Sequence, residues 1–308
     1  MRFTSARLDP DLSFGRRITG LTLDQLGEPE VRDELRRIWI EDGLVLFQEG
    51  DDSEEFQVEL SQVFGPLELH PVKEVRNAQC PELIELRSVP GKDTTFEVDG
   101  VICGAWLPFH TDLIYCHTIN HGGILRAVEP TSWGGQTGFT DKIDAYARLP
   151  EDLKKRIEGL SAVYQMCTLA HSPFATRADA RVLSMSDYAQ QVMGRVGEDF
   201  PPVAHPLVFT QAETGRKVLN FSPRFAIYLE GMDNAEGNEL LHRLAQHIFD
   251  GPAYFHDWKV GELMLWDNWR MLHCVTPAPV DEVRIMKRTT IAGDYAMGRT
   301  LRTSRQAA

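Results

Sequence analysis

The sequence contains few cysteines, and they follow no pattern that would pair them. Its 308 residues include five cysteines, scattered along the chain and never arranged as C-x-x-C. Such a set argues against a disulfide framework and a structural zinc site, and is typical of a reduced intracellular protein. The first residues lack the apolar run of a secretory signal, and no hydrophobic stretch approaches the length that spans a bilayer. We therefore expect a cytoplasmic protein.

The sequence also has fewer basic than acidic residues. Lys and Arg number 32 against 45 Asp and Glu, which gives a formal net charge of −13. An acidic chain of this kind argues against nucleic acid or an anionic membrane as its main partner. The sequence also lacks internal repeats, low-complexity tracts and Pro- or Ser-rich linkers. Residues 1–308 are therefore predicted to form a single domain.

The apolar periodicity predicts an α/β beginning followed by many short strands. Residues 30–41 have helical spacing and end at Asp42-Gly43, residues 44–47 indicate a buried strand, and residues 53–64 indicate a helix opened by a capping serine. Further strands are predicted at residues 83–86, 123–128, 136–140, 217–220, 262–266 and 283–291, and further helices at residues 142–160 and 235–248. This order favours a mainly β fold with flanking helices, either a β-sandwich or a jelly roll.

Two segments show no clear pattern. Residues 88–104 contain PGKDTT and VDG, and residues 168–202 are long and polar. Long connections without structure of their own are usually lids or disordered segments. We therefore expect two mobile loops that close over a site.

His110 and Asp112 form an H-x-D sequence in a segment that is expected to be extended. Alternate residues of an extended chain point the same way, so both side chains could reach one metal ion. A third ligand from a distant strand would complete a two-histidine, one-carboxylate triad, which suits a non-haem iron(II) oxygenase. Taken alone, H-x-D is weak evidence, and His110 could equally be a hydrogen-bonded core or loop histidine.

The C-terminal region supplies a candidate third ligand, His273, and two arginines. The β-branched stretch 283–291 predicts a strand in which Arg284 and Arg288 share one face. On an outer face the two arginines would be ordinary solvated charges. In a barrel interior each would need an anionic partner, so that one could bind a co-substrate and the other a second anion.

Together these motifs resemble the taurine dioxygenase/TfdA family of iron(II)- and 2-oxoglutarate-dependent oxygenases over nearly the whole chain. They fall in the family order: F-H-T-D at 109–112, G-G-Q-T at 134–137, V-L-N at 218–220, W-D-N at 266–268, His273, and R-x-x-x-R at 284–288. Their joint order and spacing are specific, whereas any one motif would not be. The resemblance implies a single catalytic domain with a double-stranded β-helix (jelly roll) core.

The resemblance also implies roles for individual residues. His110, Asp112 and His273 would be the iron ligands. Arg284, helped by the hydroxyl of Thr137, would bind the distal carboxylate of 2-oxoglutarate, a task that suits a planar guanidinium. Thr137 could instead be present for packing, as a β-branched residue in a strand.

Substrate binding is implied for four further residues. Arg288 and His70 stand where taurine-type members hold the anionic group of the substrate, although Arg288 could support the iron-bound end of 2-oxoglutarate or a neighbouring acid, and His70 could be a loop histidine. Trp106 and Phe109 lie where taurine-specific members have polar residues. This departure favours a larger or more apolar substrate than taurine, so we expect a small, anionic organic molecule with apolar parts.

The implied activity is that of a dioxygenase that uses iron(II), 2-oxoglutarate and dioxygen. It would hydroxylate an unactivated C–H bond with release of succinate and carbon dioxide, and Asp112 supports this outcome because halogenating relatives lack the carboxylate. Desaturation, cyclisation or oxidative cleavage with the same cofactors is an alternative. A metal-dependent hydrolase and a non-catalytic jelly-roll protein are more distant ones. The oligomeric state is open, with a homo-oligomer the commonest arrangement.

Overall fold

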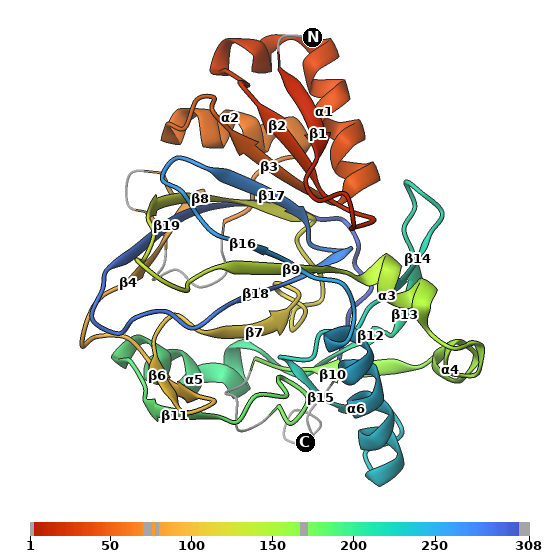
Figure 1. Ribbon diagram of the computed structural model, residues 1–308. Helices are drawn as coiled ribbons and strands as arrows, with labels where there is room; N and C mark the ends of the chain where they lie inside the picture. Colours follow the sequence, from red (N-terminus) through yellow and green to blue (C-terminus); the bar gives the residue numbers. More distant parts are fainter. Residues whose placement is uncertain (1–2, 70–75, 78–79, 167–171, 302–308) are drawn as a thin grey trace.

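Two facing β-sheets form the centre of the computed structural model, which describes residues 3–69, 76–77, 80–166 and 172–301 (Figure 1). A layer that contains the N-terminus covers one end of the pair. A large insertion with most of the helices covers the other end (Figure 1). Facing sheets with helices on the outside confirm the predicted jelly roll with flanking helices.

The larger sheet has seven strands in the order β1-β2-β3-β17-β8-β19-β4. All neighbours pair antiparallel except β2 and β3, which pair parallel. Because β19 lies between β8 and β4, both of its edges are hydrogen-bonded. The strands are β1 (Thr4–Arg7), β2 (Arg16–Thr19), β3 (Leu44–Gln48), β4 (Leu83–Ser88), β8 (Gly122–Glu129), β17 (Leu263–Asp267) and β19 (Arg284–Ile291).

The smaller sheet has the antiparallel order β16-β9-β18-β7. Its strands are β7 (Leu107–His110), β9 (Thr137–Asp141), β16 (Tyr254–His256) and β18 (Met271–Val275). Phe139 of this sheet is buried in one apolar cluster with Trp266 and Met286 of the larger sheet. Each such side chain removed from water stabilises the fold by about 1.5–3 kcal/mol.

The N-terminal layer contains η1 (Leu23–Gly27), α1 (Pro29–Asp42) and α2 (Glu54–Phe64). One stripe of α1 is buried against the layer, and Gly43, with φ 72°, ends the helix in a left-handed conformation. Ser53 begins α2 because its side chain accepts a hydrogen bond from the backbone N of Phe56 at 3.0 Å. The predicted helix–strand–helix opening is therefore confirmed.

The insertion between β9 and β16 differs from the prediction at its start. It contains α3 (Lys142–Arg148), α4 (Glu151–Ile157), β10 (Ser161–Tyr164), β11 (Ala180–Ser184), α5 (Asp187–Asp199), β12 (Val203–Pro206), β13 (Val208–Thr210), β14 (Lys217–Leu219), β15 (Ala226–Leu229) and α6 (Ala235–Phe249). The single helix expected at residues 142–160 is two helices, because Pro150 offers no backbone N–H to continue the first. Strands β15, β10, β12 and β20 (Arg299–Thr300) form one small sheet, and β13 pairs with β14.

The two segments expected to be loops contain regular structure. Residues 88–104 form β5 (Thr95–Val98) and β6 (Val101–Cys103), and β11 from residues 168–202 pairs with β5 to complete a three-stranded sheet. Buried Val98, Cys103 and Trp106 give this sheet a small core of its own. The expectation of structureless loops is therefore wrong, while a lid function and a single catalytic domain over residues 1–308 stay predictions.

In the part of the chain that the structure describes, no helix combines the length and the apolar character that a bilayer crossing requires.

Two buried histidines make the stability of the fold sensitive to acid. Burial lowers the pKa of His121 and of His205 from 6.5 to about 4. The ring of His121 stacks on Trp269 with centroids 3.5 Å apart, and Nε2 of His205 lies 2.9 Å from the carbonyl O of Cys116. Between pH 6.5 and 4 the unfolded chain binds protons that the folded chain does not, so protonation favours unfolding.

We expect the free energy of unfolding to fall between pH 6.5 and 4 by up to about 1.4 kcal/mol per pH unit for each histidine. His121→Phe keeps the aromatic stacking and removes one contribution, so the stability of this variant should depend less on pH. Denaturant titrations at neutral and mildly acidic pH measure the slopes, with His117→Phe at an exposed position as the control. Equal slopes for His121→Phe and the wild type would contradict this expectation.

Candidate metal centre

Two histidines meet in the smaller sheet because of strand register. In the antiparallel pairing of β7 with β18, His110 lies directly opposite His273. The centroids of their rings are 4.1 Å apart, and the two residues are only 4% and 7% exposed. Opposed residues of neighbouring strands point to the same face of a sheet. The register thus brings together two side chains that are far apart in the sequence.

Asp112 joins the two histidines from a turn. Strand β7 ends at His110, and residues 112–115 form a turn in which Leu113 has φ 54°. The prediction that the H-x-D segment is extended throughout is therefore wrong, although its side chains converge as expected. Asp112 Oδ1 lies 3.5 Å from Nε2 of His110, and Oδ2 lies 3.5 Å from Nε2 of His273. One ligand atom from each residue lies within 4.8 Å of the others, so the three could hold one metal ion.

The turn is held in place by Asn268, from the W-D-N motif. Its Oδ1 accepts a hydrogen bond from the backbone N of Asp112 at 2.9 Å, and its Nδ2 donates to the carbonyl O of Asp112 at 3.0 Å. Nδ2 also donates to the carbonyl O of Asn120 at 3.1 Å. Asn268 lies in the connection between β17 and β18, so the segment that leads into the strand with His273 also supports the turn that carries Asp112.

The protonation states of the three residues fit a divalent cation. Nδ1 of His110 lies 2.9 Å from the carbonyl O of Pro108, which assigns the proton to Nδ1 and leaves the Nε2 lone pair free for a metal. Burial and the neighbouring His110 lower the pKa of His273 well below 6.5. Burial raises the pKa of Asp112, but Arg288 and the two histidines outweigh it and hold the pKa well below its usual range. One carboxylate with two neutral imidazoles is the donor set of non-haem iron(II) sites.

Arg288 lies beside this triad, inside the fold. Its Nη2 is 2.7 Å from Oδ2 of Asp112, and its guanidinium carbon is 5.1 Å from the ring centroid of Trp266. The contact with Asp112 is an ion pair without good hydrogen-bond geometry, and Nε of Arg288 is buried with no hydrogen-bond partner among the described residues. Of the two alternatives for the arginines, the structure shows the interior one, with Arg284 and Arg288 both buried. Arg288 contacts a neighbouring acid, Asp112, which was one of the alternatives for it.

Arg284 lies on the same face of β19 but forms no ion pair with any residue that the structure describes. It is 6% exposed, and its Nη2 donates to the carbonyl O of Gly135 at 3.1 Å. Burial lowers the pKa of Arg284 to about 10. A buried guanidinium without a counter-ion is unfavourable. This position is therefore suited to an anion that the described residues do not supply.

Thr137 of β9 has a hydroxyl proton available for such an anion. Its Oγ1 accepts a hydrogen bond from Nε1 of Trp258 at 2.9 Å. An indole N–H can only donate, so the hydroxyl can direct its own proton to another acceptor. No local motif in the sequence marks Trp258, because Thr137, the residue it contacts, is distant in the chain.

The two glycines of G-G-Q-T shape the space around Arg284. Gly134 and Gly135 both have φ +61°. A Cβ at Gly134 would lie 1.9 Å from the carbonyl O of Pro277, and a Cβ at Gly135 would lie 3.1 Å from Nε of Arg284. Both the backbone conformation and the close approach therefore require glycine here.

Phe109 faces away from the metal centre. It precedes His110 in β7, so the pleat of the strand directs the two side chains to opposite faces of the smaller sheet. The ring of Phe109 packs against Phe255 with centroids 6.3 Å apart and lines an outer cavity of about 460 Å³. Trp106 borders the same cavity and packs on Phe96. Phe109 therefore lies on the face of the smaller sheet opposite the triad, and its role in substrate binding stays a prediction.

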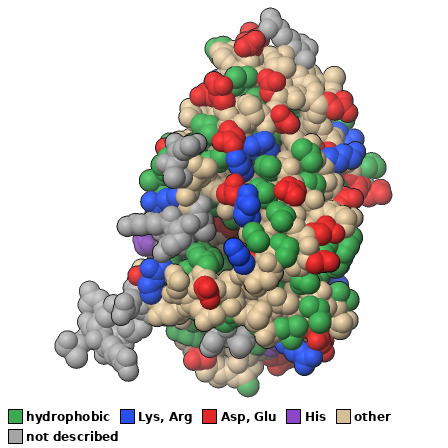
Figure 2. All heavy atoms as spheres, turned by 90° about the vertical axis from the view of Figure 1, so that its left-hand side faces the viewer, with side chains coloured by type: hydrophobic (Ala, Val, Ile, Leu, Met, Phe, Trp, Pro, Cys, Tyr) green, Lys and Arg blue, Asp and Glu red, His purple; other side chains and the backbone are tan. Residues whose placement is uncertain are grey.

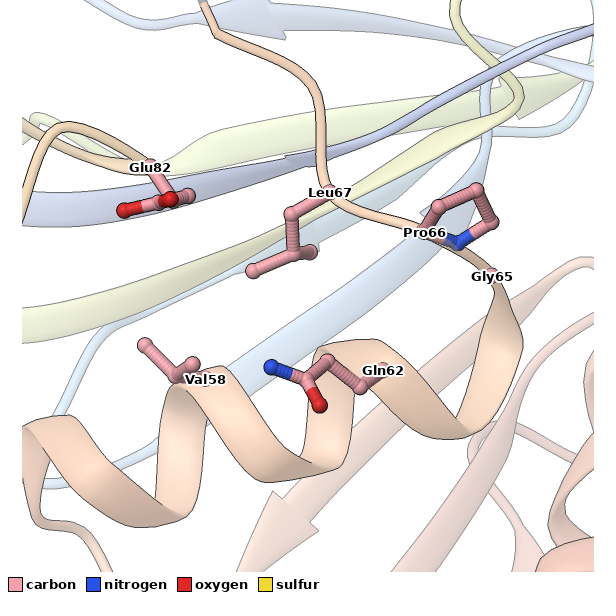
Figure 3. A pocket seen from close by; sticks show the side chains of 6 residues that line it. All are labelled: Val58, Gln62, Gly65, Pro66, Leu67 and Glu82. Carbon is pink, nitrogen blue, oxygen red and sulfur yellow. The ribbon is translucent and has the colours of Figure 1, made fainter.

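His70 lies outside the described residues. Close to it in sequence, the chain at residues 65–67 and α2 border a hollow of about 550 Å³ (Figure 3). Its lining consists of Val58, Gln62, Gly65, Pro66, Leu67 and Glu82. A single acidic side chain in this lining offers no convergent ligand set. The candidate site is therefore the triad, because its three side chains could hold one metal ion.

Comparisons with known proteins agree with this geometry. The chain matches the family model described as "Taurine catabolism dioxygenase TauD, TfdA family" over residues 4–290. It is 32% identical over 287 residues to the (S)-phenoxypropionate/alpha-ketoglutarate-dioxygenase of Sphingobium herbicidovorans, covering 93% of this chain and 94% of the relative. It is 31% identical over 278 residues to the alpha-ketoglutarate-dependent 2,4-dichlorophenoxyacetate dioxygenase of Cupriavidus pinatubonensis, covering 88% and 91%.

A solved structure shares the fold. The crystal structure of AAD-2 in complex with Mn(II) and N-oxalylglycine superposes with a TM-score of 0.73 at 24% identity, covering 96% of this chain and 100% of that chain.

We expect Mn(II) to bind the metal-free protein and to raise its melting temperature, because binding to the folded state alone stabilises it. His110→Ala or Asp112→Ala should weaken Mn(II) binding by more than about 100-fold, since changes to residues that merely support ligands already cost 10- to 100-fold. Electron paramagnetic resonance of free Mn(II) measures the affinity. His117→Ala, an exposed histidine, is the control. Undiminished binding by His110→Ala would place the metal elsewhere.

Proposed function

The chain belongs to the taurine catabolism dioxygenase TauD, TfdA family and is a 2-oxoglutarate-dependent dioxygenase, and we propose that it oxidises a small aryloxyalkanoate-type carboxylate at the His110–Asp112–His273 centre. Family membership sets aside the hydrolase and the non-catalytic alternatives. The proposal adds the residues that bind each ligand and the class of the prime substrate.

The proposed site for 2-oxoglutarate is supported by Arg284, whose buried guanidinium has no carboxylate partner among the described residues. The distal carboxylate of 2-oxoglutarate would supply the missing counter-ion through two parallel hydrogen bonds. Thr137 would add a third, because Trp258 occupies the acceptor side of its hydroxyl and leaves the proton free. Such an arrangement fixes the direction in which the co-substrate lies.

His110, Asp112 and His273 would hold iron(II), which supplies the activation of dioxygen coupled to decarboxylation of 2-oxoglutarate. The carboxylate of Asp112 would enter as an anion and His273 as a neutral donor, because both pKa values lie well below their usual ranges, and His110 would bind through Nε2 because its Nδ1 faces the carbonyl O of Pro108. Arg288 would bind a further anionic group, since its Nε has no partner within the described structure. Water would be excluded by the surrounding side chains, which are mostly buried.

Two considerations support an aryloxyalkanoate. The relatives named above act on phenoxypropionate and on 2,4-dichlorophenoxyacetate. In addition, the ring of Phe225 meets that of His110 edge-on with centroids 5.8 Å apart, and Tyr115 packs on Phe225 at 5.0 Å. Aromatic walls of this kind suit an aryl group.

An anionic substrate is proposed from the placement of positive charge. Near the middle of the face drawn in Figure 2, Lys and Arg side chains lie among Asp, Glu and hydrophobic side chains, whereas Arg284 and Arg288 are buried inside the fold. Local positive charge attracts small anions even on an acidic protein. Arg288 and His70 are the proposed substrate contacts. Hydroxylation is the proposed outcome, and a homo-oligomer in the cytoplasm is the proposed state.

Arg284→Ala should lower kcat/KM for 2-oxoglutarate by at least about 100-fold, because two hydrogen bonds to a charged group are lost. Thr137→Val keeps the volume and removes one hydrogen bond, so the loss should be about 10-fold. Succinate release at varied 2-oxoglutarate concentration measures both. Arg87→Ala, on the exposed side of the neighbouring strand β4, is the control. An unchanged kcat/KM in Arg284→Ala would show that the co-substrate binds elsewhere.

Phenoxypropionate and 2,4-dichlorophenoxyacetate should stimulate succinate release above the substrate-free rate, with one substrate molecule consumed per succinate formed. Taurine should give little stimulation, because the proposed site offers aromatic walls. Parallel assays of succinate and of remaining substrate measure this coupling. Strong stimulation by taurine and none by either aryloxy acid would overturn the proposed substrate class.

A further inference from the structure

Lys142 is a fully buried lysine whose side chain reaches the metal-binding turn. It is the first residue of α3 and is 0% exposed. Its Nζ donates a hydrogen bond to Oγ1 of Thr111 at 2.9 Å. Thr111 is the residue between His110 and Asp112. An ammonium group is costly to bury, so its position calls for a physical reason.

The carboxylates near Lys142 are already engaged by other groups. Asp141 accepts hydrogen bonds from Arg270 at 3.1 and 2.7 Å. Asp267 accepts one from Gln211 at 2.8 Å and is also bonded by backbone N–H groups. Neither forms an ion pair with Lys142 among the described contacts, and they act on it only at longer range. Its direct partner is therefore the hydroxyl of Thr111.

Besides Arg288, which pairs with the carboxylate of Asp112, three further parts of the fold hold the segment from His110 to Asp112. Lys142 of α3 holds the Thr111 side chain, and Oγ of Ser222 accepts a hydrogen bond from the Thr111 backbone N at 3.0 Å. Asn268 holds both backbone groups of Asp112. The amine of Lys142 gives the Thr111 side chain a directed hydrogen bond, and burial lowers the pKa of Lys142 to about 7.

We propose that Lys142 is a positioning residue for the metal centre and acts through the hydroxyl of Thr111, which it holds so that His110 and Asp112 converge before metal binds. The inference rests on the proposed function, because it takes His110, Asp112 and His273 as the metal ligands. A purely structural Lys142 would contribute to the stability of the metal-free fold without affecting metal affinity. A positioning Lys142 changes metal affinity, because ligands that are no longer preorganised must be ordered by the metal.

The test is a double-mutant cycle on the metal-free protein, with Mn(II) as the probe. Lys142→Met removes the charge at similar length, and Thr111→Val removes the hydroxyl at equal volume. Each should weaken the Kd for Mn(II) by about 10- to 100-fold, and the double variant should be no weaker than the weaker single variant. Thr111→Ser restores the hydroxyl and should recover near wild-type affinity. If Lys142→Met fails to fold, the Thr111 variants carry the test alone.

Gln25→Met is the matched control, because it removes a hydrogen bond of another buried side chain, from the backbone N of Thr22 to Oε1 of Gln25 at 3.0 Å, in the N-terminal layer. It should lower the melting temperature and leave the Kd for Mn(II) unchanged. Wild-type affinity in Thr111→Val, or additive losses in the double variant, would overturn the proposal while the metal centre stands. A wild type that does not bind Mn(II) would overturn the metal centre and this inference together.

Discussion

Hydrogen bonding between β7 and β18 sets His110 opposite His273, and the rest of the metal centre is arranged around that register. A shift of one residue in either strand would turn one imidazole to the outer face, where Phe109 now lies. The connection that follows β7 then places Asp112 over the same point, and the connection between β17 and β18 supplies Asn268 to hold it. The arrangement of the three residues thus depends first on backbone pairing and second on side-chain contacts.

The second constraint is electrostatic. Although the protein is acidic, the buried side chains of Arg284, Arg288 and Lys142 lie on the strand and the helix beside a single ligand carboxylate, and burial lowers the pKa of Lys142 to about 7. A divalent cation entering such a site is opposed by these charges, and a dianionic co-substrate would offset that opposition. The three side chains differ in their partners among the described residues: Arg288 pairs with Asp112, Lys142 donates to Thr111, and Arg284 donates to the carbonyl O of Gly135.

The spacing of apolar residues correctly predicted those helices and strands whose apolar face also packs against the core. The helix that ends at Gly43, the capped helix at Ser53 and the strand with Arg284 and Arg288 all lie where periodicity predicted them. Apolar periodicity gave the wrong structure at a proline within a predicted helix and in a segment whose structure depends on pairing with a distant strand. Pro150 divided a predicted helix. The polar segment that contains β11 became ordered because it pairs with β5, a contact between residues far apart in the chain.

The sequence by itself determined the kinds of residue in the site and their order along the chain: H-x-D, G-G-Q-T, the late histidine and the two arginines. These follow from chemistry, because iron needs imidazole and carboxylate ligands and a buried anion needs guanidinium and hydroxyl donors. Only the tertiary structure decided which face Phe109 takes, that Asp112 binds from a turn, that Arg288 meets Asp112, and that Trp258 and Lys142 support Thr137 and Thr111. Those outcomes depend on strand register and on contacts between distant segments, which no local stretch of sequence encodes.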